Sequence, residues 1–282
     1  MKKETKPYGS WKSPITSDLI VAESIKVDHP CLDGEDMYWL EMRPSEGGRT
    51  ILVRRSADGR TQDMTLPPYN VRTRVHEYGG GAYLVRDGEI YFSNFSDQRV
   101  YHQTRDSVPR AISPETGRLR YADYELDRKR GRLIAVREDH CDAAQEAVNT
   151  IVSLSFGQES NGTVLVEGAD FYSNPRISPD GTQLLWLSWN HPNMPWDGTK
   201  LWMAEILEDG SLGEQHKLAG GTDESIFQPQ WSPDGNVYFV SDRNGWWNLY
   251  RSGEKENENE IMLEMEAEFA LPQWTFGRST YA

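Results

Sequence analysis

The sequence contains little cysteine, no excess of basic residues and no long apolar run. Cys31 and Cys141 are far apart and form neither a metal-ligand pair nor a disulfide framework, which fits a reducing compartment. With 44 acidic and 30 basic residues the net charge is −14, which repels nucleic-acid phosphates. No stretch approaches the ~18 apolar residues of a membrane helix, and none near the amino terminus is typical of a signal peptide. We therefore expect a soluble cytoplasmic protein, with neither nucleic acid nor a membrane as a partner.

Signatures of common catalytic and metal sites are missing as well. There is no P-loop and no paired-histidine zinc motif. The nearest approach to the Gly-x-Ser-x-Gly nucleophile elbow surrounds Ser279, but the second glycine and a following histidine are lacking, so Ser279 is interpreted as part of a strand. Residues 138–142 read Glu-Asp-His-Cys-Asp, yet consecutive ligand types on one short loop seldom converge on an ion. We therefore predict no catalytic residue, no metal and no cofactor in this chain.

Windows with the apolar period of a helix are nearly absent. Residues 142–148 are the candidate for one short helix. Residues 254–260 carry like charges that repel one another, and a disordered loop is expected there.

What the sequence does contain is a repeated glycine turn followed by a short apolar strand. The turn glycines stand 43 to 54 residues apart, at Gly34, Gly88, Gly131, Gly181 and Gly235. Asp-Gly and related pairs tolerate the positive φ angles of a tight hairpin. The residues that follow are nearly continuously apolar, as in Leu-Leu-Trp-Leu over 184–187. Such a pattern is typical of a strand covered on both faces.

Each repeat supplies four strand candidates, which predicts an all-β protein, a β-propeller of four-stranded antiparallel blades. The predicted organisation is a lead-in over 1–27, blades over roughly 28–68, 75–114, 118–168, 171–220 and 226–264, and the start of a next blade over 269–282. That last segment repeats at 272–274 the Pro-Gln-Trp of 229–231. We therefore expect an incomplete propeller, with about five blades and the start of a sixth, in a chain that is part of a longer protein.

Polar and aromatic segments are the candidates for a functional surface. They lie at 74–81, beside a glycine triplet, and at 137–140, 191–198 and 241–247, each after the second strand of a blade. Connections of that kind emerge on the same face of the disc. Aromatic and charged groups on such loops are typical of a docking or substrate face, and packing within the propeller is the alternative explanation, which we favour slightly. The candidate contact residues are Glu77, Arg137, Glu138, Asp139, His191, Trp196, Asp197, Asp242, Arg243, Trp246 and Trp247.

Segments spread over nearly the whole chain carry a family resemblance. Residues 8–16, 75–82, 91–95, 191–198 and 246–250 are similar, in this order, to segments of prolyl oligopeptidase family serine peptidases of the acylaminoacyl-peptidase and dipeptidyl-aminopeptidase-like branch. The resemblance implies a propeller, usually seven-bladed, that caps a carboxy-terminal α/β-hydrolase domain with a Ser-Asp-His triad. Neither that domain nor the final blades lie in this chain.

Two functions follow as expectations. The resemblance implies a non-catalytic propeller that gates and orients short peptides for the hydrolase domain, which would be its partner. The alternative is a free-standing propeller that scaffolds protein–protein interactions.

Overall fold

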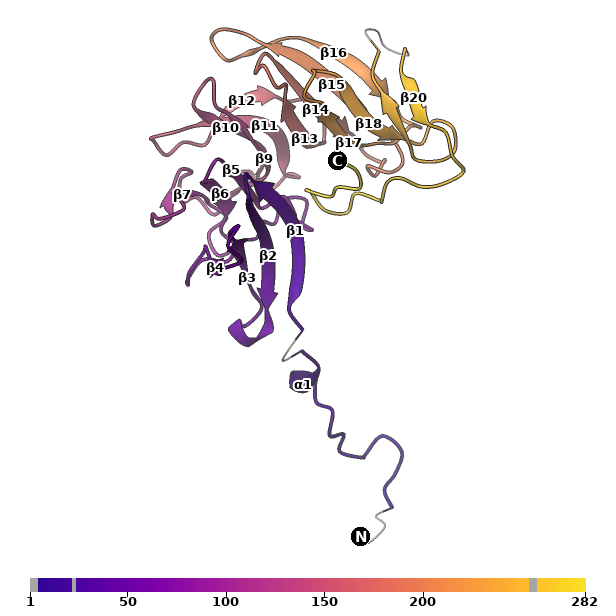
Figure 1. Cartoon of the computed structure of the whole chain (residues 1–282). Helices are drawn as coiled ribbons and strands as arrows, with labels where there is room; N and C mark the ends of the chain where they lie inside the picture. Colours follow the sequence, from indigo (N-terminus) through magenta and orange to yellow (C-terminus); the bar gives the residue numbers. More distant parts are fainter. Residues whose placement is uncertain (1–4, 22–23, 254–257) are drawn as a thin grey trace.

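The computed structural model describes residues 5–21, 24–253 and 258–282, which are built almost wholly of strands (Figure 1). Helices among these residues are limited to α1 (Ser17–Val21) and the short 3-10 helix η1 (Pro44–Glu46). In this part of the chain no helix is long and apolar enough to cross a membrane. The prediction of a loop over 254–260 falls largely outside the described residues, and its last residue begins a strand.

The helix predicted over residues 142–148 is wrong. These residues form an irregular connection, in which Asp142 Oδ1 accepts a hydrogen bond from the backbone N of Ala144 (3.0 Å). This local bond offers the backbone an alternative to the helix, and so short a segment cannot offset the cost of helix nucleation.

Within the described residues, twenty strands form five four-stranded antiparallel sheets, each from consecutive strands. Blade one contains β1 (Lys26–Asp33), β2 (Asp36–Arg43), β3 (Arg49–Arg55) and β4 (Thr61–Asp63). Blade two contains β5 (Tyr83–Arg86), β6 (Glu89–Ser93), β7 (Val100–Thr104) and β8 (Arg110–Ala111). Blade three contains β9 (Leu119–Asp127), β10 (Arg132–Asp139), β11 (Val148–Ser155) and β12 (Thr163–Val166). Blade four contains β13 (Phe171–Ile177), β14 (Gln183–Trp189), β15 (Lys200–Ile206) and β16 (Leu212–Gly220). Blade five contains β17 (Ile226–Trp231), β18 (Val237–Ser241), β19 (Asn248–Arg251) and β20 (Glu260–Leu263).

The first strands of successive blades contact one another, from β1 through β5, β9 and β13 to β17, so they are the innermost strands. Figure 1 shows the five sheets arranged side by side around this centre. The predicted β-propeller with five four-stranded blades is thus confirmed.

The glycine turns lie where they were predicted, between the first and second strands of each blade. All five turn glycines have a positive φ, between 61° and 85°. In the Ser-Pro-Asp-Gly turn of blade four, hydrogen bonds from Ser178 and Thr182 to the carboxylate lower the pKa of Asp180 to about 2. Turn chemistry therefore positions the second strand of each blade.

The hydrophobic core is divided into layers between neighbouring blades. In the layer between blades three and four, Leu184 and Trp186 of β14 pack with Ile134 and Val136 of β10. Similar layers lie between blades one and two, two and three, and four and five. Residues 184–187 are at most 1% exposed, which confirms that this strand is covered on both faces. Each blade is therefore stabilised mainly by its neighbours.

A bulge recurs in the innermost strands, and the sequence pattern did not predict it. In β1, β9, β13 and β17 the register slips at a residue with positive φ, namely His29 (49°), Asp123 (54°), Asn174 (53°) and Gln228 (50°). A bulge bends the strand and redirects its side chains. Here they bond across the centre: Asp123 Oδ2 accepts from the backbone N of Asn174 (2.6 Å), and Gln228 Nε2 donates to the carbonyl of Tyr281 (2.7 Å).

The segment over 269–282, predicted to begin a further blade, pairs with no strand among the described residues. It returns from blade five toward blades one and two, as the C-terminal trace in Figure 1 shows. There Phe276 forms a single parallel bridge with Gly80, and Arg278 Nη1 lies 3.5 Å from Asp28 Oδ1. Phe276 is 3% exposed and joins the core layer of blades three and four. Burial of this ring and hydrogen bonds to blade five, such as that from the Tyr281 hydroxyl to the carbonyl of Gln228 (2.6 Å), hold the segment in place of sheet pairing.

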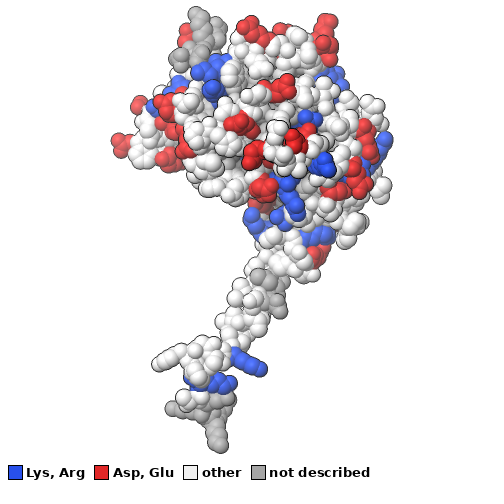
Figure 2. Space-filling view, turned by 180° about the vertical axis from the view of Figure 1, so that it is seen from behind, with Lys and Arg blue, Asp and Glu red and all other residues white. Residues whose placement is uncertain are grey.

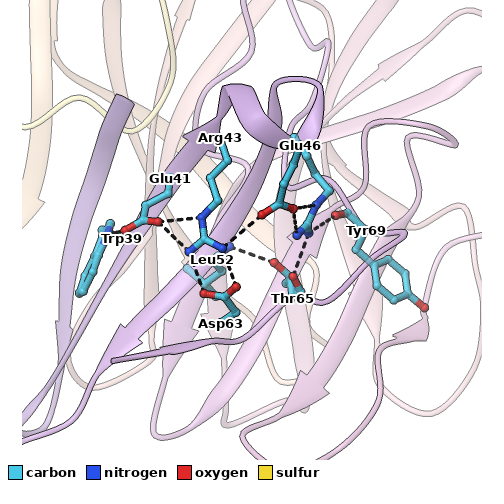
Figure 3. Close-up of polar contacts among 9 residues, drawn as sticks. Trp39, Glu41, Arg43, Glu46, Leu52, Asp63, Thr65 and Tyr69 are labelled. Carbon is cyan, nitrogen blue, oxygen red and sulfur yellow. Dashed lines mark hydrogen bonds and ion pairs between the residues drawn. The ribbon is translucent and has the colours of Figure 1, made fainter. Parts of the chain in front are cut away.

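Arg43 holds the outer edge of blade one together (Figure 3). Its guanidinium binds both oxygens of Asp63 in the edge strand β4, at 2.6 and 2.8 Å, and one oxygen of Glu41, at 2.8 and 3.0 Å. Trp39 Nε1 donates to the other oxygen of Glu41 (2.9 Å). Bidentate arginine–carboxylate pairs of this kind fix the relative orientation of the two side chains in addition to the attraction between their charges. They tie β4, which pairs with β3 at three positions, to β2.

Candidate functional site

The connections after the second strands emerge on one face of the disc, as expected, and hydrogen bonds link them. Asn149 Nδ2, at the start of β11, donates to the carbonyl of Asp170 (2.8 Å). The carboxylate of Asp170 in turn accepts from the backbone N of His191 (2.9 Å) in the β14–β15 connection. Blades three and four are thereby joined on this side, which we name the connection face.

Ser225 makes the next link on the connection face. Its hydroxyl donates to the carbonyl of Pro195 in the β14–β15 connection (2.9 Å). Its backbone N donates to Asp242 Oδ1 in the β18–β19 connection (2.7 Å). The candidate loops of blades three, four and five therefore form one continuous surface.

Glu138 lies at the centre of a polar network. Its carboxylate is 5% exposed, accepts from the backbone N of His76 (3.1 Å), and lies 3.1 Å from Arg120 Nη1 and 2.7 Å from His140 Nε2. Arg120 Nη1 also binds Glu77 Oε1 (2.7 Å), and this hydrogen bond lowers the pKa of Glu77. The network attaches the segment before β5 to blade three, so Glu138 and Glu77 already have cationic partners.

Arg137 and Asp139, which flank Glu138 in β10, do not join this network. Arg137 Nη1 donates to the carbonyl of Asn161 in the β11–β12 connection (3.2 Å). Asp139 Oδ1 accepts from the backbone N of Cys141 (2.8 Å) and closes a turn. Both side chains bond to nearby backbone.

His191 and Asp197 stabilise the β14–β15 connection. The hydrogen bond from the backbone N of His191 lowers the pKa of Asp170, whose carboxylate also lies 3.1 Å from His191 Nδ1. Asp197 Oδ2 accepts from the backbone N of Met194 (2.8 Å). These contacts shape the loop that carries Trp196.

Trp196 belongs to a row of partly exposed aromatic side chains. Its ring centroid lies 4.5 Å from that of Trp274, and Trp274 lies 5.3 Å from Tyr78. Trp274 is 50% exposed and Tyr78 is 63% exposed. The row, which we name the aromatic row, runs from the β14–β15 connection across the C-terminal segment to the segment before β5. Exposed apolar surface of this kind marks a docking or binding surface.

The candidates of blade five are mostly engaged within the propeller. Burial raises the pKa of Asp242, which accepts the hydrogen bond described above. Arg243 Nη2 lies 2.7 Å from Glu224 Oε1. The Trp247 ring packs against β17, whereas Trp246 remains 38% exposed. Trp246 is therefore the member of this group that can contact a partner without unpacking the blade.

A cavity of about 330 Å³ opens on the connection face beside blades one and two. Leu40 and Val71 contribute to its apolar wall. Arg72 and Arg74 stand over Phe95, with their Cζ atoms 4.4 and 4.6 Å from the ring centroid. Phe95 lies in the β6–β7 connection, so the cavity and the candidate loops share one face. The volume is at the lower end of the range for ligand pockets.

Ser279 has no activating base beside it. Its Oγ accepts from Gln228 Nε2 (2.9 Å) and donates to the carbonyl of Tyr281 (3.1 Å). Ser279 is therefore engaged in hydrogen bonds with blade five and with its own segment. In the part of the chain that the structure describes, no group of three or more His, Cys, Asp or Glu side chains could hold a metal ion.

His76 is a buried histidine whose protonation should destabilise the fold. Its ring contacts Phe171 (5.1 Å), Trp189 (5.7 Å) and Phe276 (4.8 Å), and burial lowers its pKa to about 4. An unfolded histidine titrates near pH ~6.5. Between these values the unfolded state binds more protons, so stability is lost as the pH falls from about 6.5 to 4, by at most about 1.4 kcal/mol per pH unit.

The measurement is urea unfolding at pH 6.5 and 4.5 for the wild type and His76→Asn, because asparagine tolerates the positive φ at this position (54°). We expect the wild type to lose more stability between the two pH values than the variant does. Equal losses in both proteins would contradict the assignment.

Sequence reasoning missed Arg72, Arg120 and Trp274, and it included Arg74 only as the first residue of the segment over 74–81. In an acidic chain, two arginines close together between predicted strands are the sequence signal that could have identified Arg72 together with Arg74. Trp274 could have been found from the repeated Pro-Gln-Trp, although its partners could not. Arg120 carries no local signal, because its acidic partners come from other segments.

No protein-family model matches the sequence, and no curated protein matches it. Among solved structures, a puromycin hydrolase is 36% identical with a TM-score of 0.88; the match covers 97% of this chain and 44% of that one. The puromycin-hydrolyzing peptidase of Mycobacterium tuberculosis is 35% identical with a TM-score of 0.87, covering 99% and 45%. A prolyl endopeptidase is similar in fold, with 13% identity, a TM-score of 0.63 and coverage of 87% and 37%.

This chain spans less than half the length of each of these proteins. Identity of 35–36% extends over nearly all of its residues. The chain therefore belongs to the prolyl oligopeptidase family of peptidases, of which it represents the β-propeller portion.

Proposed function

We propose that this chain is the non-catalytic propeller of a serine peptidase and that its connection face meets an α/β-hydrolase domain of the same protein. The relatives at 35–36% identity are a hydrolase and a peptidase, and the chain spans under half their length. The observation that carries the proposal is the aromatic row of Tyr78, Trp196 and Trp274, exposed beside a cavity on that face. The propeller restricts access to short peptides and positions them, which accelerates a reaction without chemistry of its own.

The N-terminal segment supports a domain contact. Figure 1 shows it extending away from the propeller, and most of its described part is drawn as uncharged in Figure 2. Tyr8, Trp11, Ile15, Leu19 and Ile20 are each at least 55% exposed. So many large apolar side chains exposed in one segment are typical of a surface that packs against a partner. We assign the hydrolase domain as that partner.

The reaction assigned to the parent protein is acyl transfer from an amide to an activated serine and then to water. The 282-residue chain alone should not catalyse it, because binding groups cannot replace a nucleophile and its base. Purified chain is expected to release 4-nitroaniline from aminoacyl and acyl-peptide anilides no faster than buffer does. Turnover that Ser279→Ala abolishes would contradict this expectation.

The sequence of the gene provides the first test of the proposal. Reading it past the codon for Ala282 should reveal Gly-x-Ser-x-Gly followed by Asp and His. An open reading frame that ends without this motif would overturn the proposal in favour of a free-standing scaffold.

In the protein that the gene encodes, Trp196→Ala is expected to lower kcat/KM for short peptide substrates by about tenfold or more, since buried aromatic contacts dominate interfaces. The control is Phe156→Ala. Phe156 is 38% exposed and follows β11, at the opposite end of the blade from the connection face. The control should leave kcat/KM unchanged. Equal effects of both substitutions would contradict a role for the aromatic row.

A further inference from the structure

Two arginines of the cavity lack a partner within the described part of the chain. The guanidinium groups of Arg72 and Arg74 make neither a hydrogen bond nor an ion pair with any described residue, and each contacts the Phe95 ring instead. By contrast, Arg120 and Arg99 bind glutamates at 2.7 Å. In a chain with 44 acidic residues, adjacent unpaired cations invite an anion from outside the described structure.

The backbone of both arginines is anchored by hydrogen bonds, that of Arg74 by a buried glutamine. Gln98 is 6% exposed; its Oε1 accepts from the backbone N of Arg74 (2.9 Å) and its Nε2 donates to the carbonyl of Phe95 (2.8 Å). The backbone N of Arg72 donates to the carbonyl of Ser93 (3.1 Å). The backbone on either side of the cation–π contacts is thus anchored, and a preorganised site loses less entropy on binding.

The acidic groups that line the cavity are already neutralised. Asp28 lies 3.1 Å from Lys26 Nζ and 3.5 Å from Arg278 Nη1, and these cations together with His29 lower the pKa of Asp28 against the effect of burial. Glu77 is paired with Arg120. Asp28 balances only one of its two cationic neighbours, and Arg74 acts on Glu77 as a more distant charge. Arg72 and Arg74 are the cavity cations without an ion pair among the described residues, and their planar forks match a carboxylate.

The side chains that line the cavity indicate which kind of carboxylate ligand fits it. Its apolar lining consists of Leu40, Met42, Val71, Ala82 and Tyr78, and Thr50, Thr73 and Thr275 line it as well. The apolar side chains complement an aliphatic or aromatic residue. An apolar residue that ends in a carboxylate matches both parts of the cavity.

We propose that Arg72 and Arg74 bind the C-terminal carboxylate of a short peptide whose last, apolar residue occupies the cavity. The choice of a peptide rests on the proposed function. Such a subsite lies on the propeller, so it fixes the distance from the bound carboxylate to a catalytic domain on the same face. Peptides too short or too long to span that distance lose the contact.

The test is calorimetric titration of the 282-residue chain with N-acetyl-Ala-Ala-Leu and with its C-terminal amide, at low salt. Because hydrogen bonds to charged groups are the stronger ones, we expect the acid to bind about tenfold more tightly than the amide. The double variant Arg72→Gln/Arg74→Gln should bind the two equally. Phe95→Leu, which removes the ring under both guanidiniums, should reduce the preference in part.

The control is Arg55→Gln/Arg60→Gln, which removes the same charge from exposed positions around the β3–β4 turn, on the opposite face. This variant should keep the preference, and the melting temperatures should show that all variants fold. Equal binding of acid and amide by the wild type, binding of neither, or loss of preference in the control would each overturn the proposal. None of these results bears on the gene or on Trp196→Ala, which decide the proposed function separately.

Discussion

Replacing Asp123 with asparagine should lower the free energy of unfolding by about 2–4 kcal/mol, because it leaves a largely buried guanidinium without its main partner. Asp123 is 3% exposed, and its Oδ1 lies 3.1 Å from the guanidinium of Arg176. Glu125 is also near Arg176, but it makes no hydrogen bond or ion pair with Arg176 among those described, and burial raises the pKa of Glu125. Asparagine tolerates the positive φ of this bulge (54°), and the change therefore tests the charge rather than the backbone.

The matched control is Glu159→Gln, which removes the charge from an exposed pair. Glu159 lies 2.7 Å from Arg99 and is 50% exposed, so its loss should cost less than about 1 kcal/mol. Urea unfolding followed by tryptophan fluorescence measures both variants. An effect at Asp123 no larger than that at Glu159 would show that the central ion pair contributes nothing to stability.

Gly80→Ala should destabilise the protein by about 3 kcal/mol, because both ways of accommodating the added methyl group cost free energy. A Cβ atom at Gly80 would lie 2.4 Å from the carbonyl oxygen of Phe276 and 2.7 Å from its N, at a φ of +88°. Retaining the contact strains both segments. Releasing it exposes a phenylalanine that is 3% exposed in the native fold.

Gly235→Ala separates the clash from the backbone strain. Gly235 has nearly the same φ (+85°), but nothing lies within 4 Å of the Cβ position. We expect it to cost only about 1–2 kcal/mol, the strain of a left-handed alanine. A second check combines Gly80→Ala with Phe276→Ala: because both remove one contact, their effects should sum to more than the double variant loses. Additive effects, or equal losses at Gly80 and Gly235, would rule out the clash.

The blades could be predicted from the sequence because their signals are local. The turn at Gly181 and the apolar run over 184–187 lie within seven residues of each other, and both are where they were expected. The bulges of the innermost strands could not be predicted, because residues as different as His29, Asp123 and Gln228 adopt the left-handed conformation there. Bonds to neighbouring segments, rather than residue type, hold these positions.

The candidate site was only partly predictable for the same reason. Trp196 was singled out and lies in the aromatic row, but its neighbour Trp274 comes from a segment nearly 80 residues further along the chain. Arg243 was singled out and is already paired with Glu224. Arg72, which was not singled out, remains unpaired among the described residues. Whether an arginine is engaged depends on contacts that the chain makes only after folding.

The bridge between Gly80 and Phe276 also bears on the order of folding. It closes a loop of nearly 200 residues, whereas each blade hairpin closes a few. By the logarithmic dependence of closure entropy on length, such a loop costs about 2.5 kcal/mol more to close than a loop of roughly ten residues. Hairpins and adjacent blades can therefore form before this contact, which joins early and late parts of the chain last. A contact that forms late is largely absent from the folding transition state, so weakening the bridge should accelerate unfolding more than it slows refolding.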